Sequence, residues 1–279
     1  MTNSVSISLV ERVEADVNYL LYNGQRPVTY TYPPPPGIPQ RSGIPDPRRV
    51  QIANARLLPQ APSLDTFGFE LHEQATEVDF ASEVAIREIY YRETEVLLRR
   101  ATGAEKVVIF DHTLRDSTPA HGQEGIREPV LVVHNDQTFT SAPRRVLRHL
   151  PADEAAARLQ HRFAIINAWR PIGHAVQNWP LAVLDGRTLE VEDLIASDLV
   201  YRDMVGEIYA VLHRERHRWF YFPNLRTDEV ALIKIYDSNT DGTVRLSAHT
   251  AFADPTSPPD APPRRSIELR ALVFFPPAS

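Results

Sequence analysis

The sequence predicts a mainly β protein with flanking helices, built on a double-stranded β-helix core, the jelly-roll arrangement of cupins. Two observations lead to this fold class. From residue 127 onward, eight segments rich in β-branched and aromatic residues alternate with turn-forming residues. The clearest helical pattern comes before them, between residues 79 and 104. A series of short strands that follows helices is typical of a barrel or double sheet with helices on one face.

The composition is that of a globular protein. Of the 279 residues, 43% are hydrophobic and 24% are charged, and the formal net charge is -6. The chain has no cysteine, which excludes disulfides, thiolate metal sites and a cysteine nucleophile. The start shows no signal-peptide pattern, and no apolar run approaches the roughly 20 residues of a membrane helix. We therefore expect a cytoplasmic protein that binds neither nucleic acid nor a membrane.

The first 60 residues lack clear strand or helix periodicity. Within them, the segment YTYPPPPGIPQRSGIPDPRRV suits either a flexible linker or a polyproline II arm laid over the domain. Tyr22, Tyr30 and Tyr32 favour an arm that packs. We expect residues 1–60 to form an irregular N-terminal arm that packs on a jelly-roll core of residues 61–279, in a chain that forms a single domain overall.

Helical spacing is clearest where Ile86, Ile89, Tyr90 and Leu97 recur along one segment, and Gly103 marks its end. The apolar run over residues 106–115 then predicts a buried strand. Two shorter helices are expected over residues 141–161 and 191–200. These elements would flank the strands of the core.

His134 and Asp136 stand at the end of the apolar segment VLVVHND. On a strand, residues two apart point to the same face, roughly 6.6 Å apart along the chain. Both side chains would then enter the barrel and supply two corners of a metal site. A second histidine from a distant strand would complete a 2-His-1-carboxylate triad, which leaves open positions on Fe(II) for a bidentate co-substrate and dioxygen. The alternative is a strand end whose polar side chains bond to the backbone or to solvent.

Three histidines compete for the third position: His249, His213 and His217. The segment HRERHR places charges on both faces of a strand, which favours a solvated hairpin over a dry cavity. Arg226, which follows it, lies in a turn, and Asp228 two residues later would repel a carboxylate. His249 has small or apolar neighbours and leads into the last strand.

The end of the chain resembles that of 2-oxoglutarate oxygenases and isopenicillin N synthase. In those enzymes a distal histidine precedes an Arg-x-Ser on the last strand, and the arginine and hydroxyl hold the far carboxylate of the co-substrate. Here His249 precedes Arg264 and Ser266. A guanidinium fork pairs bidentately with a carboxylate, which suits this role. Arg270 and Arg170 are competitors for it.

A wider resemblance covers roughly residues 65–275. The segments TGAEKVVIFDHTLR, VHNDQT, INAWRPI, PLAVLDGRTL, WFYFPNLRTDEVALIKIYDS, HTAFADP and RRSIELRALVFF, in this order, resemble the AsaB-type hydroxylase/desaturase family. That family includes the gibberellin desaturase and a component of cephamycin 7α-methoxylation. The resemblance implies a non-haem Fe(II) and 2-oxoglutarate oxygenase of secondary metabolism that consumes O2. It also implies that His134, Asp136 and His249 are the iron ligands.

Arg170 is a cation within an apolar strand, and a buried arginine needs an anion. Its partner would be Asp185, Glu229 or another structural acid; otherwise it binds a carboxylate of substrate or co-substrate. Asn167 and Trp169 lie on the opposite face of the same strand and are candidate substrate contacts.

Arg115, in the segment FDHTLRD, raises the same question. It would either reach the barrel mouth and contact substrate or form a salt bridge with Asp111 or Asp116.

The expected function is hydroxylation, desaturation or oxidative cyclisation of a small-molecule substrate, with Fe(II), 2-oxoglutarate and O2. Two other classes remain open. A zinc hydrolase could use the same three ligands, although the sequence shows no adjacent glutamate as base and gives Arg-x-Ser no role. A non-enzymatic jelly-roll binding module would make the three ligands coincidental.

Overall fold

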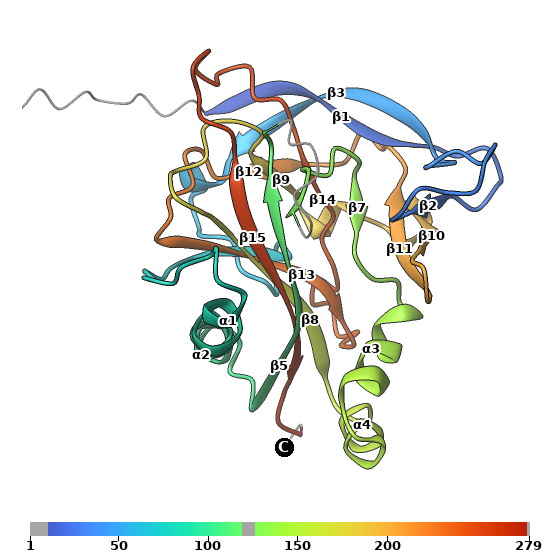
Figure 1. Cartoon of the computed structure of the whole chain (residues 1–279), viewed down its shortest axis with the longest axis vertical. Coiled ribbons are helices and arrows are strands. Elements are labelled where there is room, and N and C mark those ends of the chain that lie inside the picture. The colour runs from blue at the N-terminus through green and yellow to red at the C-terminus, as the bar shows by residue number, and fades with distance from the viewer. Residues whose placement is uncertain (1–10, 119–125, 278–279) are drawn as a thin grey trace, which may run out of the picture.

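Two β-sheets face one another in the computed structural model, which describes residues 11–118 and 126–277 (Figure 1). Among these residues, the larger sheet has nine strands, in the spatial order β1 (Arg12–Leu21), β3 (Ile44–Asn54), β12 (Trp219–Tyr221), β9 (Leu181–Leu184), β14 (His249–Ala251), β7 (His134–Asn135), β11 (Val205–Val211), β10 (Leu194–Val200) and β2 (Val28–Tyr30). The smaller sheet has six, in the order β4 (Phe69–Glu73), β13 (Glu229–Asp237), β8 (Phe163–Pro171), β15 (Arg265–Phe274), β5 (Lys106–Asp116) and β6 (Ile126–Arg127).

Helices flank these sheets: α1 (Glu83–Ala85), a π-helical turn (Ile86–Tyr90), α2 (Tyr91–Thr102), α3 (Ser141–His149) and α4 (Ala152–Arg158). Short 3-10 turns cover η1 (Ala55–Leu57), η3 (Gly186–Thr188) and η4 (Val191–Asp193). No described helix is both long and apolar enough to cross a membrane.

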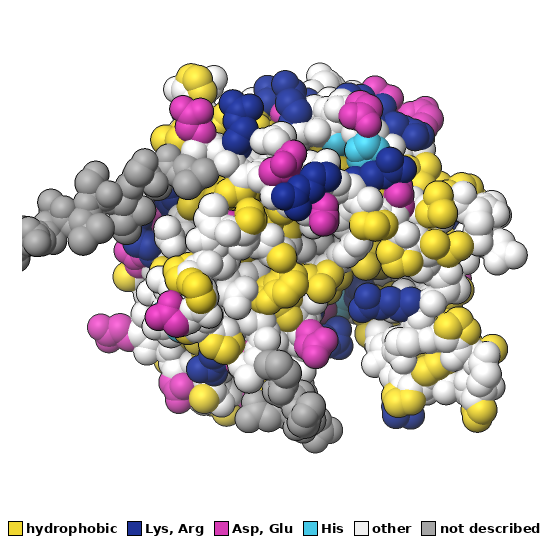
Figure 2. Space-filling model, turned by 90° about the horizontal axis from the view of Figure 1, so that it is seen from above, with side chains coloured by type: hydrophobic (Ala, Val, Ile, Leu, Met, Phe, Trp, Pro, Cys, Tyr) yellow, Lys and Arg dark blue, Asp and Glu magenta, His cyan; other side chains and the backbone are white. Residues whose placement is uncertain are grey.

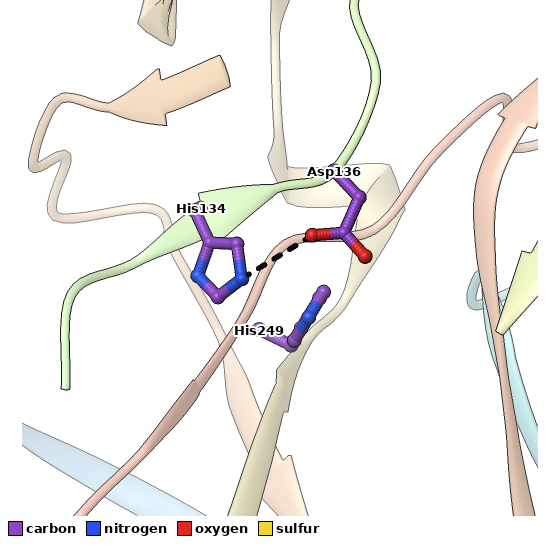
Figure 3. A group of neighbouring side chains, drawn as sticks. All are labelled: His134, Asp136 and His249. Carbon is purple, nitrogen blue, oxygen red and sulfur yellow. Dashed lines mark ion pairs between the residues drawn. The ribbon is translucent and has the colours of Figure 1, made fainter. Parts of the chain in front are cut away.

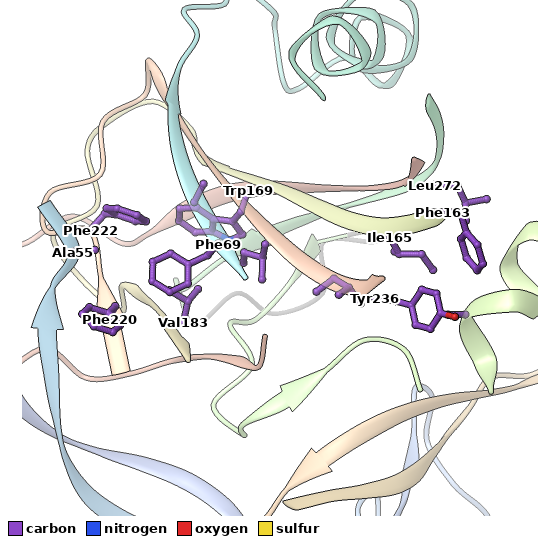
Figure 4. Packing of buried hydrophobic residues seen from close by; sticks show 14 of the residues in the cluster. Ala55, Phe69, Phe163, Ile165, Trp169, Val183, Phe220, Phe222, Tyr236 and Leu272 are labelled. Carbon is purple, nitrogen blue, oxygen red and sulfur yellow. The ribbon is translucent and has the colours of Figure 1, made fainter. Parts of the chain in front are cut away.

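Alternation along β8 divides the core into two layers. Phe163, Ile165 and Trp169 point between the sheets, where they join Val183 and Phe220 of the larger sheet (Figure 4). The intervening residues of β8 pack on the other side, in one cluster with residues of the π-helical turn and α2. The predicted mainly β fold with flanking helices is confirmed, and the space between the sheets is where a site can lie.

The helix predicted between residues 79 and 104 is present. Ile86, Tyr90 and Leu97 are buried against the six-stranded sheet, whereas Ile89 is exposed. Gly103 ends α2 in the left-handed conformation, with φ 71°, and its N–H donates to the Arg99 carbonyl at 2.9 Å. A glycine tolerates this conformation without strain.

The described part of the N-terminal region, residues 11–60, is not an irregular arm, which corrects the sequence prediction. β1 and β3 pair antiparallel from Arg12↔Ala53 to Leu21↔Ile44, and both belong to the nine-stranded sheet. Alternate residues of β1, including Val17 and Tyr19, are buried in a cluster with residues of β9 and β12. The alternation of buried apolar and exposed polar residues in β1 is a strand signal in the sequence, and the prediction of an irregular arm overlooked it.

Two further predictions are corrected. Residues 191–200, expected as a helix, form the η4 turn and then β10, which pairs with β11 and β2. Strand neighbours on both sides override the local helical pattern. The strand expected over residues 127–136 is broken up: Arg127 ends β6, Val132 makes an isolated bridge with Asn18, and His134 and Asn135 form β7.

Candidate active site

The strand pairing brings two histidines together. His249 on β14 is paired directly with His134 on β7, and their ring centroids are 4.4 Å apart. Asp136 follows β7, and its Oδ1 lies 3.5 Å from His134 Nε2 (Figure 3). One ligand atom from each of the three side chains lies within 4.8 Å of the others. This is the spacing of donors around a single ion.

Hydrogen bonds fix the orientation of His134 and Asp136. His134 Nδ1 lies 2.8 Å from the Val132 carbonyl, which can only accept, so Nδ1 carries the proton and Nε2 presents its lone pair. Asp136 Oδ2 accepts from Asn167 Nδ2 at 2.7 Å and from Arg270 Nε at 3.0 Å. Oδ1 is left facing the imidazole of His134.

His249 completes a donor set suited to a metal. Its side chain is buried, and its Nδ1 has no hydrogen-bond partner in the part of the chain that the structure describes. Burial, and then the neighbouring His134, lower the pKa of His249 to about 3. Burial opposes ionisation of Asp136, but Arg270 foremost holds its pKa well below the ordinary value. Neutral imidazole and ionised carboxylate are the forms that bind a metal.

β15 supplies a row of polar side chains on the six-stranded side of the site. This side, opposite the three ligand candidates, is called the floor of the site. Ser266, Glu268 and Arg270 alternate along it, and their side chains point between the sheets, as does that of Arg264 just before the strand. Arg265, on the other face, has a side chain that is 52% exposed. The alternation places four polar groups beside the three ligand candidates.

Arg270 is neutralised by three carboxylates. It lies 3.0 Å from Asp136, 3.1 Å from Asp111 and 2.6 Å from Glu268. Burial opposes its charge, but Glu268, Asp136 and Asp111 raise its pKa well above the ordinary value. Arg270 therefore positions Asp136, and its positive charge is already compensated by carboxylates of the protein.

Arg264 is the opposite case. Its Nη1 donates to the Trp179 carbonyl at 2.7 Å, and its guanidinium lies 5.4 Å from the Trp169 ring centroid. Nε has no partner, nor has the neighbouring Ser266 Oγ, and no described carboxylate lies within ion-pair distance. Burial, and then Arg115, lower the pKa of Arg264 to about 9. A buried cation and a buried hydroxyl left unpaired together form a place for an anion.

Comparison with known proteins agrees with this geometry. A family model described as an oxidoreductase/YMDC permease-like domain matches residues 17–274. The Fe(II)/2-oxoglutarate-dependent dioxygenase nvfI of Aspergillus novofumigatus is 35% identical over 253 residues, which cover 88% of this chain and 90% of that protein. The hydroxylase/desaturase CTB9 of Cercospora beticola is 35% identical over 255 residues, covering 82% and 76%. This chain belongs to the Fe(II)/2-oxoglutarate-dependent dioxygenase family.

A solved structure supports the assignment. The iron and alpha-ketoglutarate-dependent endoperoxidase NvfI superposes on this dioxygenase with a TM-score of 0.86 and 31% identity, covering 96% of this chain and 99% of that one. The predicted jelly-roll core is thereby confirmed. The cofactor of this dioxygenase is Fe(II), and its co-substrates are 2-oxoglutarate and O2.

Arg170 lies away from the site of the dioxygenase. Its side chain lies on the outward face of β8. Its guanidinium lies 5.2 Å from the Tyr90 ring centroid, and its Nη2 donates to the Gln74 carbonyl. Neither expected acid pairs with it: Asp185 pairs with arginines 187 and 218, and Glu229 with arginines 56 and 226. The sequence predicted that Trp169 and Arg170 lie on opposite faces of the strand, but it did not show which of the two faces points between the sheets.

The competing histidines also lie elsewhere. His213 and His217 pack on Tyr19 of β1, with ring centroids 5.1 Å and 5.6 Å away. His217 is hydrogen-bonded to the Tyr19 hydroxyl at 3.1 Å and to Asp193 at 3.2 Å. These histidines belong to a polar network around β1, and the described metal-ligand cluster contains neither of them.

Two residues that shape the site, Glu268 and Trp179, were not among the residues predicted from the sequence. Glu268 holds Arg270, and Trp179, at φ 48°, offers its carbonyl to Arg264. Glu268 had a detectable signal, because the spacing of Arg264, Ser266, Glu268 and Arg270 has the period of two of a strand face. Trp179 had none, since it lies in a loop whose strained conformation depends on its tertiary surroundings.

Proposed function

We propose that this dioxygenase hydroxylates, desaturates or oxidatively cyclises a small organic molecule, with His134, Asp136 and His249 as the iron ligands. The observation that carries the proposal is that this donor set, from the nine-stranded sheet, faces the six-stranded sheet on which the unpaired, buried Arg264 lies. Together they provide one place for a metal ion and one for the distal carboxylate of 2-oxoglutarate.

The residues present fit an Fe(II) ion. His134 Nε2, His249 and Asp136 Oδ1 are available, while Asn167 and Arg270 occupy the other oxygen of Asp136. Bound Fe(II) would activate O2, couple its reduction to the decarboxylation of 2-oxoglutarate to succinate and CO2, and supply the oxidant that removes hydrogen from the substrate. The protein's part is to orient the reactants and exclude water.

Arg264 and Ser266 are proposed to bind the distal carboxylate of 2-oxoglutarate. A carboxylate there would accept hydrogen bonds from Nε of Arg264 and from Oγ of Ser266, the two groups that are unpaired. Arg270 and Arg170 are less suited, because the first is fully paired with acids and the second faces the helices.

The relatives indicate the substrate class only broadly. They include hydroxylase/desaturases and an aspirochlorine biosynthesis protein of Aspergillus oryzae. We therefore propose a small-molecule substrate of secondary metabolism and a cytoplasmic enzyme without a nucleic-acid partner. Neither a zinc hydrolase nor a non-enzymatic binding module is supported, because the named relatives are dioxygenases.

Replacement of Arg264 tests the co-substrate assignment. Loss of one partner of a buried charge pair costs about 2–5 kcal/mol, so Arg264→Met should raise the Kd of 2-oxoglutarate about 30-fold or more. Isothermal titration of the anaerobic, metal-loaded protein measures this. Arg265→Met is the matched control, since Arg265 is adjacent but points outward. An unchanged Kd in Arg264→Met would contradict the assignment.

A further inference from the structure

A second unpaired cation, Arg115, lies on the same floor as Arg264. On β5, Arg115 is paired with Ser266 of β15. Paired residues of antiparallel strands point to the same face, so the Arg115 side chain shares the inner face with Ser266. Its charge lies among Glu268, Arg270 and Asp136, and it also acts on His249. Arg115 is therefore within electrostatic reach of Asp136 and His249, two of the three proposed ligands.

Among the described residues, no carboxylate lies within ion-pair distance of Arg115. Its one hydrogen bond in the described chain joins Nη1 to the Glu128 carbonyl at 2.8 Å. The two acids that the sequence offered as partners are engaged elsewhere: Asp111 pairs with Arg270 at 3.1 Å, and Asp116 lies 3.6 Å from Arg265. Burial lowers the pKa of Arg115, although Glu268 raises it. A half-buried guanidinium held by one carbonyl keeps N–H donors free for an anion.

Arg264 and Arg115 reach toward opposite sides of β15. Arg264 contacts Trp169 of β8 and the Trp179 carbonyl. Arg115 reaches the Glu128 carbonyl, next to β6, the outermost strand of the six-stranded sheet. The face seen from above in Figure 2 is hollowed at a point where histidine, basic and acidic side chains meet. Arg264 therefore lies on the side of β15 toward β8, and Arg115 lies on the side toward β6.

The charges leave room for a second anion. In the proposed function, one carboxylate of 2-oxoglutarate lies at the metal and the other at Arg264. Arg270 is already neutralised by its three acids, so Arg115 stays uncompensated when both co-substrates are in place. We infer that Arg115 binds a carboxylate, or an equivalent anionic group, of the primary substrate. This inference rests on the proposed function and narrows its substrate class to organic acids.

The direct test uses acetate and benzoate as probes, each matched by its neutral amide. Protein labelled with 15N-arginine is loaded with Zn(II) and 2-oxoglutarate, and the Nε–Hε resonance of Arg115 is identified by its loss in Arg115→Gln. Both carboxylates should shift this resonance saturably and bind about tenfold or more tightly than acetamide and benzamide. Arg265→Gln, an outward-facing neighbour, should leave the shift unchanged.

The second arm separates substrate binding from co-substrate binding. Arg115→Gln should weaken the two carboxylates about tenfold but leave the Kd of 2-oxoglutarate within about twofold of the wild-type value, unlike Arg264→Met. Absence of a saturable shift in the wild-type complex would overturn the inference, and this holds even if Arg115→Gln does not fold. A collapse of 2-oxoglutarate binding in folded Arg115→Gln would also overturn it and assign Arg115 to the co-substrate. Failure of wild-type protein to bind 2-oxoglutarate would instead refute the proposed function.

Discussion

Asp136 is held by two side chains from the facing sheet. Asn167 of β8 and Arg270 of β15 both donate to Oδ2, so the six-stranded sheet sets the orientation of a carboxylate that follows a strand of the nine-stranded one. Such supporting hydrogen bonds typically tune metal affinity by about 10- to 100-fold. The site is therefore built across the interface of the two sheets.

Asn167→Ala should weaken Fe(II) binding about tenfold or more without removing it, because Arg270 still holds Asp136. A competition titration with a chromophoric chelator, under anaerobic conditions, measures the change. Asn23→Ala, at an exposed position, is the control and should bind iron as the wild type does. An unaltered affinity in Asn167→Ala would show that this hydrogen bond does not position the ligand.

His217 makes stability depend on pH. Burial lowers its pKa below the ordinary 6.5, although Asp193 raises it, so the folded protein keeps this imidazole neutral where the unfolded chain is protonated. The stabilisation that the neutral His217 gives the folded protein is fully present above about pH 6.5, the pKa in the unfolded chain. It is lost as the pH falls toward the pKa of His217 in the folded protein. Between pH 7.5 and 5.5, wild type should lose more unfolding free energy in urea than His217→Gln. Equal losses would contradict this assignment.

At the scale of elements, the strands that could be predicted are those with one clear pattern. β5 was expected over residues 106–115 and is observed as Lys106–Asp116. β8 is different, because all its residues are buried on one face or the other. A strand buried on both faces does not reveal which side is inward. Arg170 was for this reason a candidate for the co-substrate, although its neighbour Trp169 faces the site.

The η3 turn fits closely under the segment that leads into β14. A Cβ added at Gly186 would lie 2.3 Å from a methyl carbon of Val244 and 2.6 Å from the Leu246 carbonyl oxygen. Gly186→Ala should therefore lower the free energy of unfolding by about 1–3 kcal/mol, as overpacking does. Denaturant titration measures it. Gly206→Ala, where the added carbon meets ordinary contacts, should be close to neutral, and equal effects at both positions would contradict the packing argument.

At the scale of the whole molecule, the sequence predicted the jelly roll and the cluster of His134, Asp136 and His249. Strand alternation is a local pattern, and it indicated the fold class. The family resemblance over roughly residues 65–275 indicated the three ligands. The pairing of β1 with β3, and of β3 with β12, was not predictable in this way. Prolines and exposed charges along β3 hide its strand character, and its place in the sheet depends on partners far along the chain.

The central claim is that His134, Asp136 and His249 hold the iron to which 2-oxoglutarate binds. Asp136→Ala should keep its fold, because Arg270 retains Glu268 and Asp111 as partners. Asp228→Ala, which removes an acid whose side chain is 49% exposed, is the control.

The decisive measurement is anaerobic titration of Fe(II) and 2-oxoglutarate, followed by visible absorption. Wild type and Asp228→Ala should develop the weak charge-transfer band of a 2-oxoglutarate–iron complex, with one iron bound per chain. Asp136→Ala should show neither the band nor stoichiometric iron while its circular dichroism matches wild type. A folded Asp136→Ala that binds one iron and develops the same band would contradict the account.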